Sequence, residues 1–263
     1  MCWVGRIKIN FSIGIVFLLA TVVYGDSQHP ISRPQAGTER TFEYTAARFG
    51  IPILKATIKI QDGSVDHRKS LFRVHAFFHS LNYLGLVFRM NNRFTSTVDA
   101  ETCSPIRYVK EVEQEGLLIK KKHYLHAFTF DALSKKVVVE KMEKQEKEEV
   151  SLPSGTHDPL SMFARLYLKE DLHPGQDIRM SIYDGVKLRQ MVFHSRKEKV
   201  KSKMYGEVEA VCLESTTSFS TFGEKEGIIR IWYIQNGGKT PIMMELDLPV
   251  GDIKFELESV DRS

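Results

Sequence analysis

Histidines with acidic neighbours are the residues whose spacing could support metal binding or catalysis. His75 and His79 have the i, i+4 spacing of a helical metal pair, but their neighbours alternate between apolar and polar types as in a strand. The pair also lacks a nearby third ligand. His157 and Asp158 precede an apolar helical pattern, where the Asp carboxylate is well suited to cap the first helical turn. We therefore predict no metal site and give Asp158 a structural role.

The familiar nucleophile and cofactor motifs do not occur in the sequence. Ser154 has no nucleophile-elbow pattern around it, and the chain contains no Gly-x-Ser-x-Gly, P-loop or dinucleotide fingerprint. The sequence therefore favours a protein that is not an enzyme and holds no cofactor. An enzyme would need His, Asp or Glu side chains that converge in a cleft, and spacing alone does not reveal such convergence.

Aromatic residues on apolar strand faces form the second group of candidates. Six of them are predicted to line a site for an apolar ligand: Phe42, Tyr44, Phe72, Phe78, Phe128 and Trp232. Two interpretations stay open, because a closed β-barrel either fills its interior with side chains or leaves room for one small ligand. A packed core is the favoured interpretation and a ligand cavity is the alternative.

The elements that must position these residues are mainly strands. Apolar and polar residues alternate over Thr41–Ile60, with a corner at Gly50, which predicts an opening hairpin with one buried face. Further strands are predicted at residues 71–78, 93–98, 106–112, 117–130, 135–142, 178–183, 186–194, 205–214, 228–233, 241–246 and 253–257. Asp184-Gly185 is the clearest hairpin turn.

Helical spacing is confined to two places. A helix is predicted to start after Asp158, with Pro159 in its first position, and to end before Pro174. A second, short helix is predicted within Ser80–Met90. We therefore expect a mainly β fold, in which a single antiparallel sheet is barrel-like or strongly curved and carries one or two short covering helices. The helix after Asp158 could cover an open end of that sheet.

The first 25 residues resemble a signal peptide. Arg6 and Lys8 precede the apolar run Phe11–Val23, and small or permissive residues follow before Asp26. The alternative is a retained membrane anchor through residues 7–24, for which the run is short. We expect an exported protein of the periplasm, with a signal peptide at 1–25, a flexible leader at 26–40 and a β domain at 41–260.

Net charge and cysteine content further limit the classes of protein that fit this sequence. The formal net charge of +4 falls to +2 when Arg6 and Lys8 leave with the signal peptide, which is not typical of a nucleic-acid-binding protein. The basic residues 120–122 could touch anionic headgroups as a peripheral membrane contact, although a solvated strand edge is favoured. Cys103 and Cys212 could form one disulfide in an oxidising compartment or stay as two buried thiols.

The order of elements resembles the DUF3108 family of exported bacterial proteins of unassigned function. The matching segments are residues 41–60, 94–108, 128–131, 157–166, 227–246 and 249–257. The resemblance covers the whole predicted domain and implies a fold, but no reaction and no catalytic residues. Gln235-Asn236 departs from an expected Asp after the Trp-containing strand. The general shape is also similar to periplasmic lipoprotein carriers, which is an analogy of fold.

These observations lead to two hypotheses of function. The first is a non-enzymatic envelope protein of a Gram-negative-type bacterium that binds an apolar or amphipathic ligand, either a lipid or a lipid-linked glycan. The second is an envelope assembly or protein-interaction factor with a fully packed core, which would use sheet edges and loops. An apolar cavity would favour the first hypothesis, and a solid core the second.

Overall fold

The computed structural model describes residues 39–62, 70–85, 87–117, 121–219, 225–235, 239–248 and 251–262. The predicted signal peptide and nearly all of the predicted leader lie outside these ranges. The described residues form fifteen strands: β1 (Arg40–Arg48), β2 (Ile51–Asp62), β3 (Leu71–Ser80), β4 (Arg89–Asp99), β5 (Pro105–Glu115), β6 (Lys122–Asp131), β7 (Lys136–Lys141), β8 (Glu146–Ser151), β9 (Thr156–His157), β10 (Asp177–Tyr183), β11 (Leu188–Ser202), β12 (Gly206–Phe219), β13 (Lys225–Gln235), β14 (Lys239–Asp247) and β15 (Ile253–Arg262).

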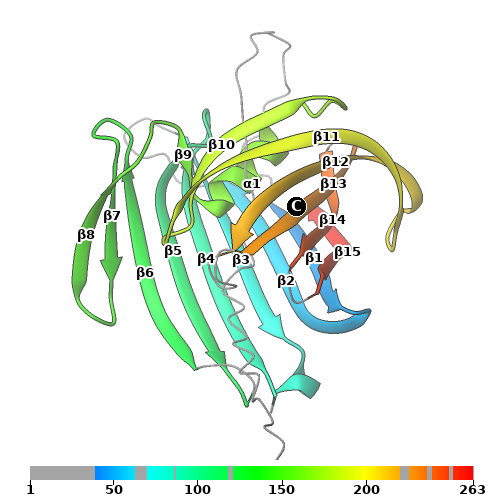
Figure 1. Cartoon of the computed structure of the whole chain (residues 1–263), viewed down its shortest axis with the longest axis horizontal. Helices are drawn as coiled ribbons and strands as arrows, with labels where there is room; N and C mark the ends of the chain where they lie inside the picture. Colours follow the sequence, from blue (N-terminus) through cyan, green and yellow to red (C-terminus); the bar gives the residue numbers. More distant parts are fainter. Residues whose placement is uncertain are drawn as a thin grey trace, which may run out of the picture.

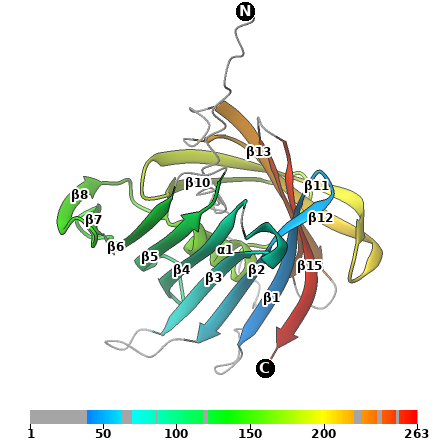
Figure 2. The ribbon, with the colours of Figure 1, turned by 90° about the horizontal axis from the view of Figure 1, so that it is seen from below.

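All fifteen strands belong to one sheet. Its order is β8-β7-β6-β5-β4-β3-β2-β1-β15-β14-β13-β12-β11-β10-β9, and every pairing is antiparallel except that of β9 with β10. The sheet curls strongly but does not close into a barrel (Figures 1 and 2). The prediction of a single, strongly curved, barrel-like sheet is therefore confirmed.

Alternation along the strands places one row of side chains inside the curl. Phe42, Ile58, Ala76 and Phe94 lie directly opposite one another on neighbouring strands, and all four are buried. Facing partners in a ladder share a face of the sheet, so these residues define the concave side. Full burial of each large apolar side chain stabilises the fold by roughly 1.5–3 kcal/mol.

One α-helix, the only one within the described ranges, fills this concave side. Helix α1 (Pro159–Leu168) packs against β3, β4, β9 and β14, and Figures 1 and 2 show it enclosed by the curl. Its side chains are buried on nearly all sides, as expected for a helix that is apolar around its circumference. The helix thus lies within the sheet rather than over an open end, because too little of its surface is polar to face water.

Local sequence signals explain the start of α1 and the β10–β11 turn. The Asp158 carboxylate accepts hydrogen bonds from the N–H groups of Leu160 and Ser161 (2.8 and 3.1 Å), which confirms the predicted N-cap. Gly185 adopts a positive φ of +87° in the β10–β11 turn, where an added Cβ would lie 2.5 Å from the Phe128 ring.

Three expectations at the level of elements were inaccurate. The predicted helix within Ser80–Met90 is a single 3-10 turn, η1 (Asn82–Leu84). The predicted strand at 117–130 starts only at Lys122, because Leu117 follows the turn at Gly116 and is 84% exposed. The predicted strand at 186–194 continues to Ser202 as β11.

Candidate functional site

Five of the six predicted ligand-binding aromatic residues are part of the packed core. Phe42 lies edge-on to the rings of Phe163 and Tyr167 of α1, with centroid distances of 6.3 and 5.2 Å. Phe78 and Phe128 continue the same aromatic layer through Phe94 and Tyr108. Tyr44 and Phe72 are buried as well, and the Tyr44 hydroxyl donates a hydrogen bond to the Pro241 carbonyl (2.8 Å). Phe42, Tyr44, Phe78 and Phe128 belong to one hydrophobic core cluster, whereas Phe72 is buried outside it.

Trp232 lies on the opposite face of the sheet. Its neighbour Tyr233 points into the core, whereas Trp232 faces Cys212 and Arg196 across the convex side. The indole Nε1 donates a hydrogen bond to the Glu198 carboxylate (2.6 Å). Trp232 is therefore separated from the other five predicted residues by the thickness of the sheet.

The His157 and Asp158 pair belongs to a closed polar cluster. The Ser96 hydroxyl donates a hydrogen bond to the Asp158 carboxylate (2.7 Å), and the Ser161 hydroxyl lies 3.2 Å from His157 Nδ1. All four side chains are buried, at 1% exposure or less. Burial raises the pKa of Asp158 and lowers the pKa of His157 to about 3. No substrate could reach these groups without unfolding, so the cluster holds the start of α1 in place.

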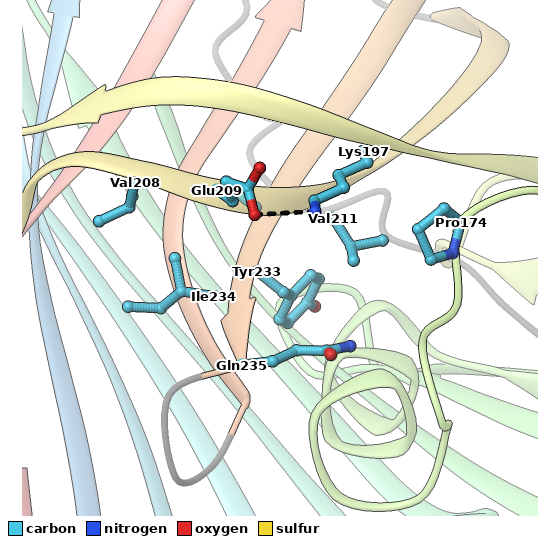
Figure 3. Close-up of a pocket in the computed structure, with 9 residues that line it drawn as sticks. Pro174, Lys197, Val208, Glu209, Val211, Tyr233, Ile234 and Gln235 are labelled. Carbon is cyan, nitrogen blue, oxygen red and sulfur yellow. Dashed lines mark ion pairs between the residues drawn. The ribbon is translucent and has the colours of Figure 1, made fainter.

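A hollow at the surface lies where β12 and β13 separate. It has a volume of about 600 Å³, within the range of small-molecule sites. Figure 3 shows its lining side chains, which come from β11, β12, β13 and the segment after α1. They are Pro174, Lys197, Val208, Glu209, Ala210, Val211, Tyr233, Ile234 and Gln235. We call this hollow the fork pocket.

The fork pocket exists because the β11–β12 hairpin extends beyond the end of the neighbouring strand β13. β12 pairs with β13 from Phe219–Lys225 up to Val211–Tyr233, and beyond that point its only partner among the described residues is β11. The outer part of this hairpin, residues 197–210, extends past the end of β13 and is called the arm (Figure 1). Lys203 near its tip forms an ion pair with Glu258 of β15 (2.6 Å), so the arm is tied to the sheet at its far end.

The wall of the pocket opposite the arm is held from two sides. Gln235 donates a hydrogen bond to the Leu172 carbonyl (2.6 Å), and Ser195 donates to the carbonyls of His173 and Gln176 (2.5 and 2.8 Å). Pro174 sits between these anchors and faces the pocket. The pocket is therefore formed before any ligand arrives.

Charges at the pocket are few and paired. Lys197 and Glu209 form an ion pair at 2.8 Å (Figure 3), with side chains 58% and 57% exposed, so the pair contributes little to stability. Tyr233 lies at the base, where burial raises the pKa of its phenol. The Tyr233 hydroxyl has no hydrogen-bond partner among the described residues. The remaining lining is mostly apolar, which suits binding rather than acid–base chemistry.

The described ranges hold neither a cluster of metal ligands nor a helix long and apolar enough to cross a membrane. No group of three or more His, Cys, Asp or Glu side chains there is placed to hold a metal ion. None of the helices in these ranges has the length and apolarity needed to cross a bilayer. In the basic cluster, Lys120 lies outside the described residues, and Lys121 pairs with Glu115 (3.7 Å). A second hollow of about 50 Å³ beside Phe130 and Leu152 is too small for an organic ligand.

Residues 41–258 match the family described as "Protein of unknown function (DUF3108)". The chain belongs to the DUF3108 family. The match spans every strand of the sheet, including the arm and both walls of the fork pocket. No curated protein matches the sequence.

A solved structure shares the fold of this DUF3108 protein. It is the crystal structure of a beta-barrel-like protein of domain of unknown function DUF1849 from Brucella abortus. The two structures align with a TM-score of 0.54 at 12% sequence identity, over 87% of this chain and 99% of that chain. At this identity the similarity shows the fold alone.

Proposed function

We propose that this DUF3108 protein acts without catalysis, as an assembly or interaction factor that holds another protein of the cell envelope at its fork pocket. The observation that carries the proposal is the pocket itself, which lies at a strand edge and is walled by fixed elements. Such an edge offers backbone donors and acceptors to a partner. The envelope location rests on the N-terminal segment, whose pattern predicts export.

The packed interior supports this choice over a carrier with an internal cavity. Helix α1 occupies the concave side, and Phe42 and Phe78 contact other core side chains rather than an empty space. Displacing such contacts to admit a ligand would cost several kcal/mol for each large side chain. Binding therefore has to use the surface of the sheet or its edges.

A lipid or lipid-linked glycan is the second candidate ligand. Val208, Ala210, Val211 and Ile234 give the fork pocket apolar walls that would suit an acyl chain. Each CH₂ removed from water would contribute about 0.8 kcal/mol. The pocket would then serve a carrier or sensor of amphipathic molecules.

The deciding experiment is site-specific crosslinking in cells that produce the full chain. A photoreactive residue replaces Glu209, which lines the pocket, or Leu133, which is 97% exposed in the β6–β7 turn and serves as the matched surface control. We expect a discrete protein adduct from position 209 and none from position 133. The adduct should disappear when Val208→Trp fills the pocket.

Protein purified from the same cells distinguishes a protein partner from a lipid ligand. Native mass spectrometry of protein purified without detergent reports any lipid that it carries. A released lipid mass with no protein adduct at position 209 would favour the second candidate. An unliganded mass together with no adduct would contradict both.

A further inference from the structure

The free edge of β12 suggests the form in which a partner is held. Residues Gly206–Ala210 pair with β11 on one side, and no described strand pairs with them on the other. In a strand, alternate residues direct their N–H and C=O groups toward each neighbour, so this free edge offers a short row of unpaired backbone groups. We infer that the fork pocket binds an extended polypeptide segment, which adds a strand to the free edge of β12. This inference rests on the proposed function.

The side chains that line the fork pocket indicate that it lies beside the edge of β12. Successive side chains of a strand point to opposite faces. The fork pocket nevertheless touches Val208 and Ala210 from one face of β12, and Glu209 and Val211 from the other. A hollow that reaches both faces must lie beside the backbone between them, where a further strand would run. Figure 3 labels Val208, Glu209 and Val211 along β12 beside the hollow.

The opposite side of the fork repeats this arrangement. Tyr233, Ile234 and Gln235 are consecutive in β13, and all three line the pocket. Tyr233 is the last residue of β13 that pairs with β12, opposite Val211. Among the described residues, Ile234 and Gln235 pair only with β14, opposite Thr240 and Lys239. The pocket therefore has a strand edge on each of two sides.

A peptide satisfies this site better than an acyl chain does. An acyl chain would cover the backbone groups of Gly206–Ala210 without forming hydrogen bonds, and an unpaired buried polar group is costly. An extended peptide would pair with them and would present side chains alternately to the two faces. One face offers Val208 and Ile234, and the other offers the ion pair of Lys197 with Glu209. The favoured segment alternates apolar residues with charged or polar ones.

The probe is a library of fluorescent heptapeptides with this alternation. Val, Ile, Leu or Phe occupies the even positions, and Lys, Glu, Thr or Gln occupies the odd positions. Binding is measured by fluorescence anisotropy to the wild-type protein and to Val208→Trp. The matched control is Val200→Trp, because Val200 faces Val208 across the arm but does not line the pocket. Circular dichroism establishes that both variants are folded.

We expect selected peptides to bind the wild type and Val200→Trp alike, and Val208→Trp about tenfold more weakly. Stepwise N-methylation of the best peptide provides the second measurement and requires no protein variant. Because only alternate N–H groups face β12, binding should fall about tenfold at every second position and change little at the positions between.

Three results would overturn the inference. They are the absence of any library peptide that binds more tightly than about 1 mM, equal binding to Val208→Trp, and a loss on N-methylation that does not alternate. Failure of the proposed function would look different, because it would show as no protein adduct from position 209 in cells. A protein adduct without the alternating pattern would keep the function and reject strand addition.

Discussion

His157 is the residue for which burial has the clearest consequence for stability. Its ring is 1% exposed and hydrogen-bonded to the backbone of Cys103, and burial lowers the pKa to about 3 from the ordinary 6.5. The unfolded chain takes up a proton below pH 6.5 while the folded protein does not. The contribution of His157 to stability is therefore complete above pH 6.5 and is lost as the pH falls toward 3.

Replacing His157 should flatten this dependence. Between pH 7 and pH 5 we expect the wild type to lose about 2 kcal/mol more unfolding free energy than His157→Gln loses. Urea unfolding at pH 7, 6 and 5 measures the difference, with the exposed His173→Gln as control. Asp158 acts in the opposite direction, because burial raises its pKa, but it is present in all three proteins. Parallel pH profiles for wild type and His157→Gln would refute the assignment.

The two cysteines of the domain should be unreactive in the folded protein. Cys103 and Cys212 are both free and buried, which decides between the two alternatives that the sequence leaves open. Burial raises the pKa of the two thiols to about 11 and about 12, so little thiolate exists at neutral pH. Iodoacetamide should modify neither cysteine in native protein and both after unfolding without reductant, as read by mass spectrometry. A pair that needs reductant before it reacts would contradict free thiols.

At the scale of elements, β8 is the outer strand at one end of the sheet. Five of its six residues are exposed, and its charges pair with β7, as Glu149 does with Lys136 (2.7 Å) and Lys147 with Glu140 (3.2 Å). An exposed strand edge invites pairing with a second molecule, and charged side chains discourage it. The Lys- and Glu-rich sequence of β8 is explained by this position.

Apolar substitutions at this edge should cause self-association. We expect Lys147→Val with Glu149→Val to raise the oligomer fraction in size-exclusion chromatography with light scattering, at protein concentrations where the wild type elutes as a single species. The control is Arg93→Val with Glu111→Val, an exposed ion pair of two interior strands on the same sheet (3.8 Å). Equal association of both double variants would point to added hydrophobicity rather than to the strand edge.

At the scale of the whole molecule, the N-terminal and C-terminal halves of the chain contribute to one shared core. β1 lies between β2 and β15, and α1 touches β3 and β4 from one half and β14 from the other. Neither half therefore has a finished core of its own. We expect one cooperative unfolding transition.

Two optical probes check this expectation. Trp232 is the only tryptophan of the described residues and reports on β13, while far-ultraviolet circular dichroism reports on all strands. Their urea midpoints should coincide. An earlier transition in tryptophan fluorescence would show that the C-terminal strands unfold separately.

The sequence predicts those parts of the fold in which a local pattern reports burial. Strands such as β2 alternate cleanly because one face is wet, and Asp158 followed by Pro159 is a local helix start. Ile231, Trp232, Tyr233 and Ile234 are apolar on both faces, so alternation cannot tell which face Trp232 takes.

The fork pocket escaped prediction for a related reason. Residues 195–203 of β11, most of which belong to the arm, are rich in Lys, Arg and Glu on both faces, so no apolar stripe marks them as strand. The length of β11 and β12 relative to β13 depends on where pairing stops, which is a property of three strands together. A pattern confined to one segment does not contain that information.

The meeting of β1 with β15 has a consequence for how the protein is made. Arg40 lies opposite Arg262, so the first described strand cannot complete its ladder until the last one has been synthesised. Contacts between such distant residues form slowly, and the nascent chain keeps its central strand open throughout translation. A polypeptide whose sheet cannot be completed during synthesis is still unfolded when it leaves the ribosome. Such a chain would be suited to passage through a narrow export channel, which is the route that the N-terminal pattern predicts.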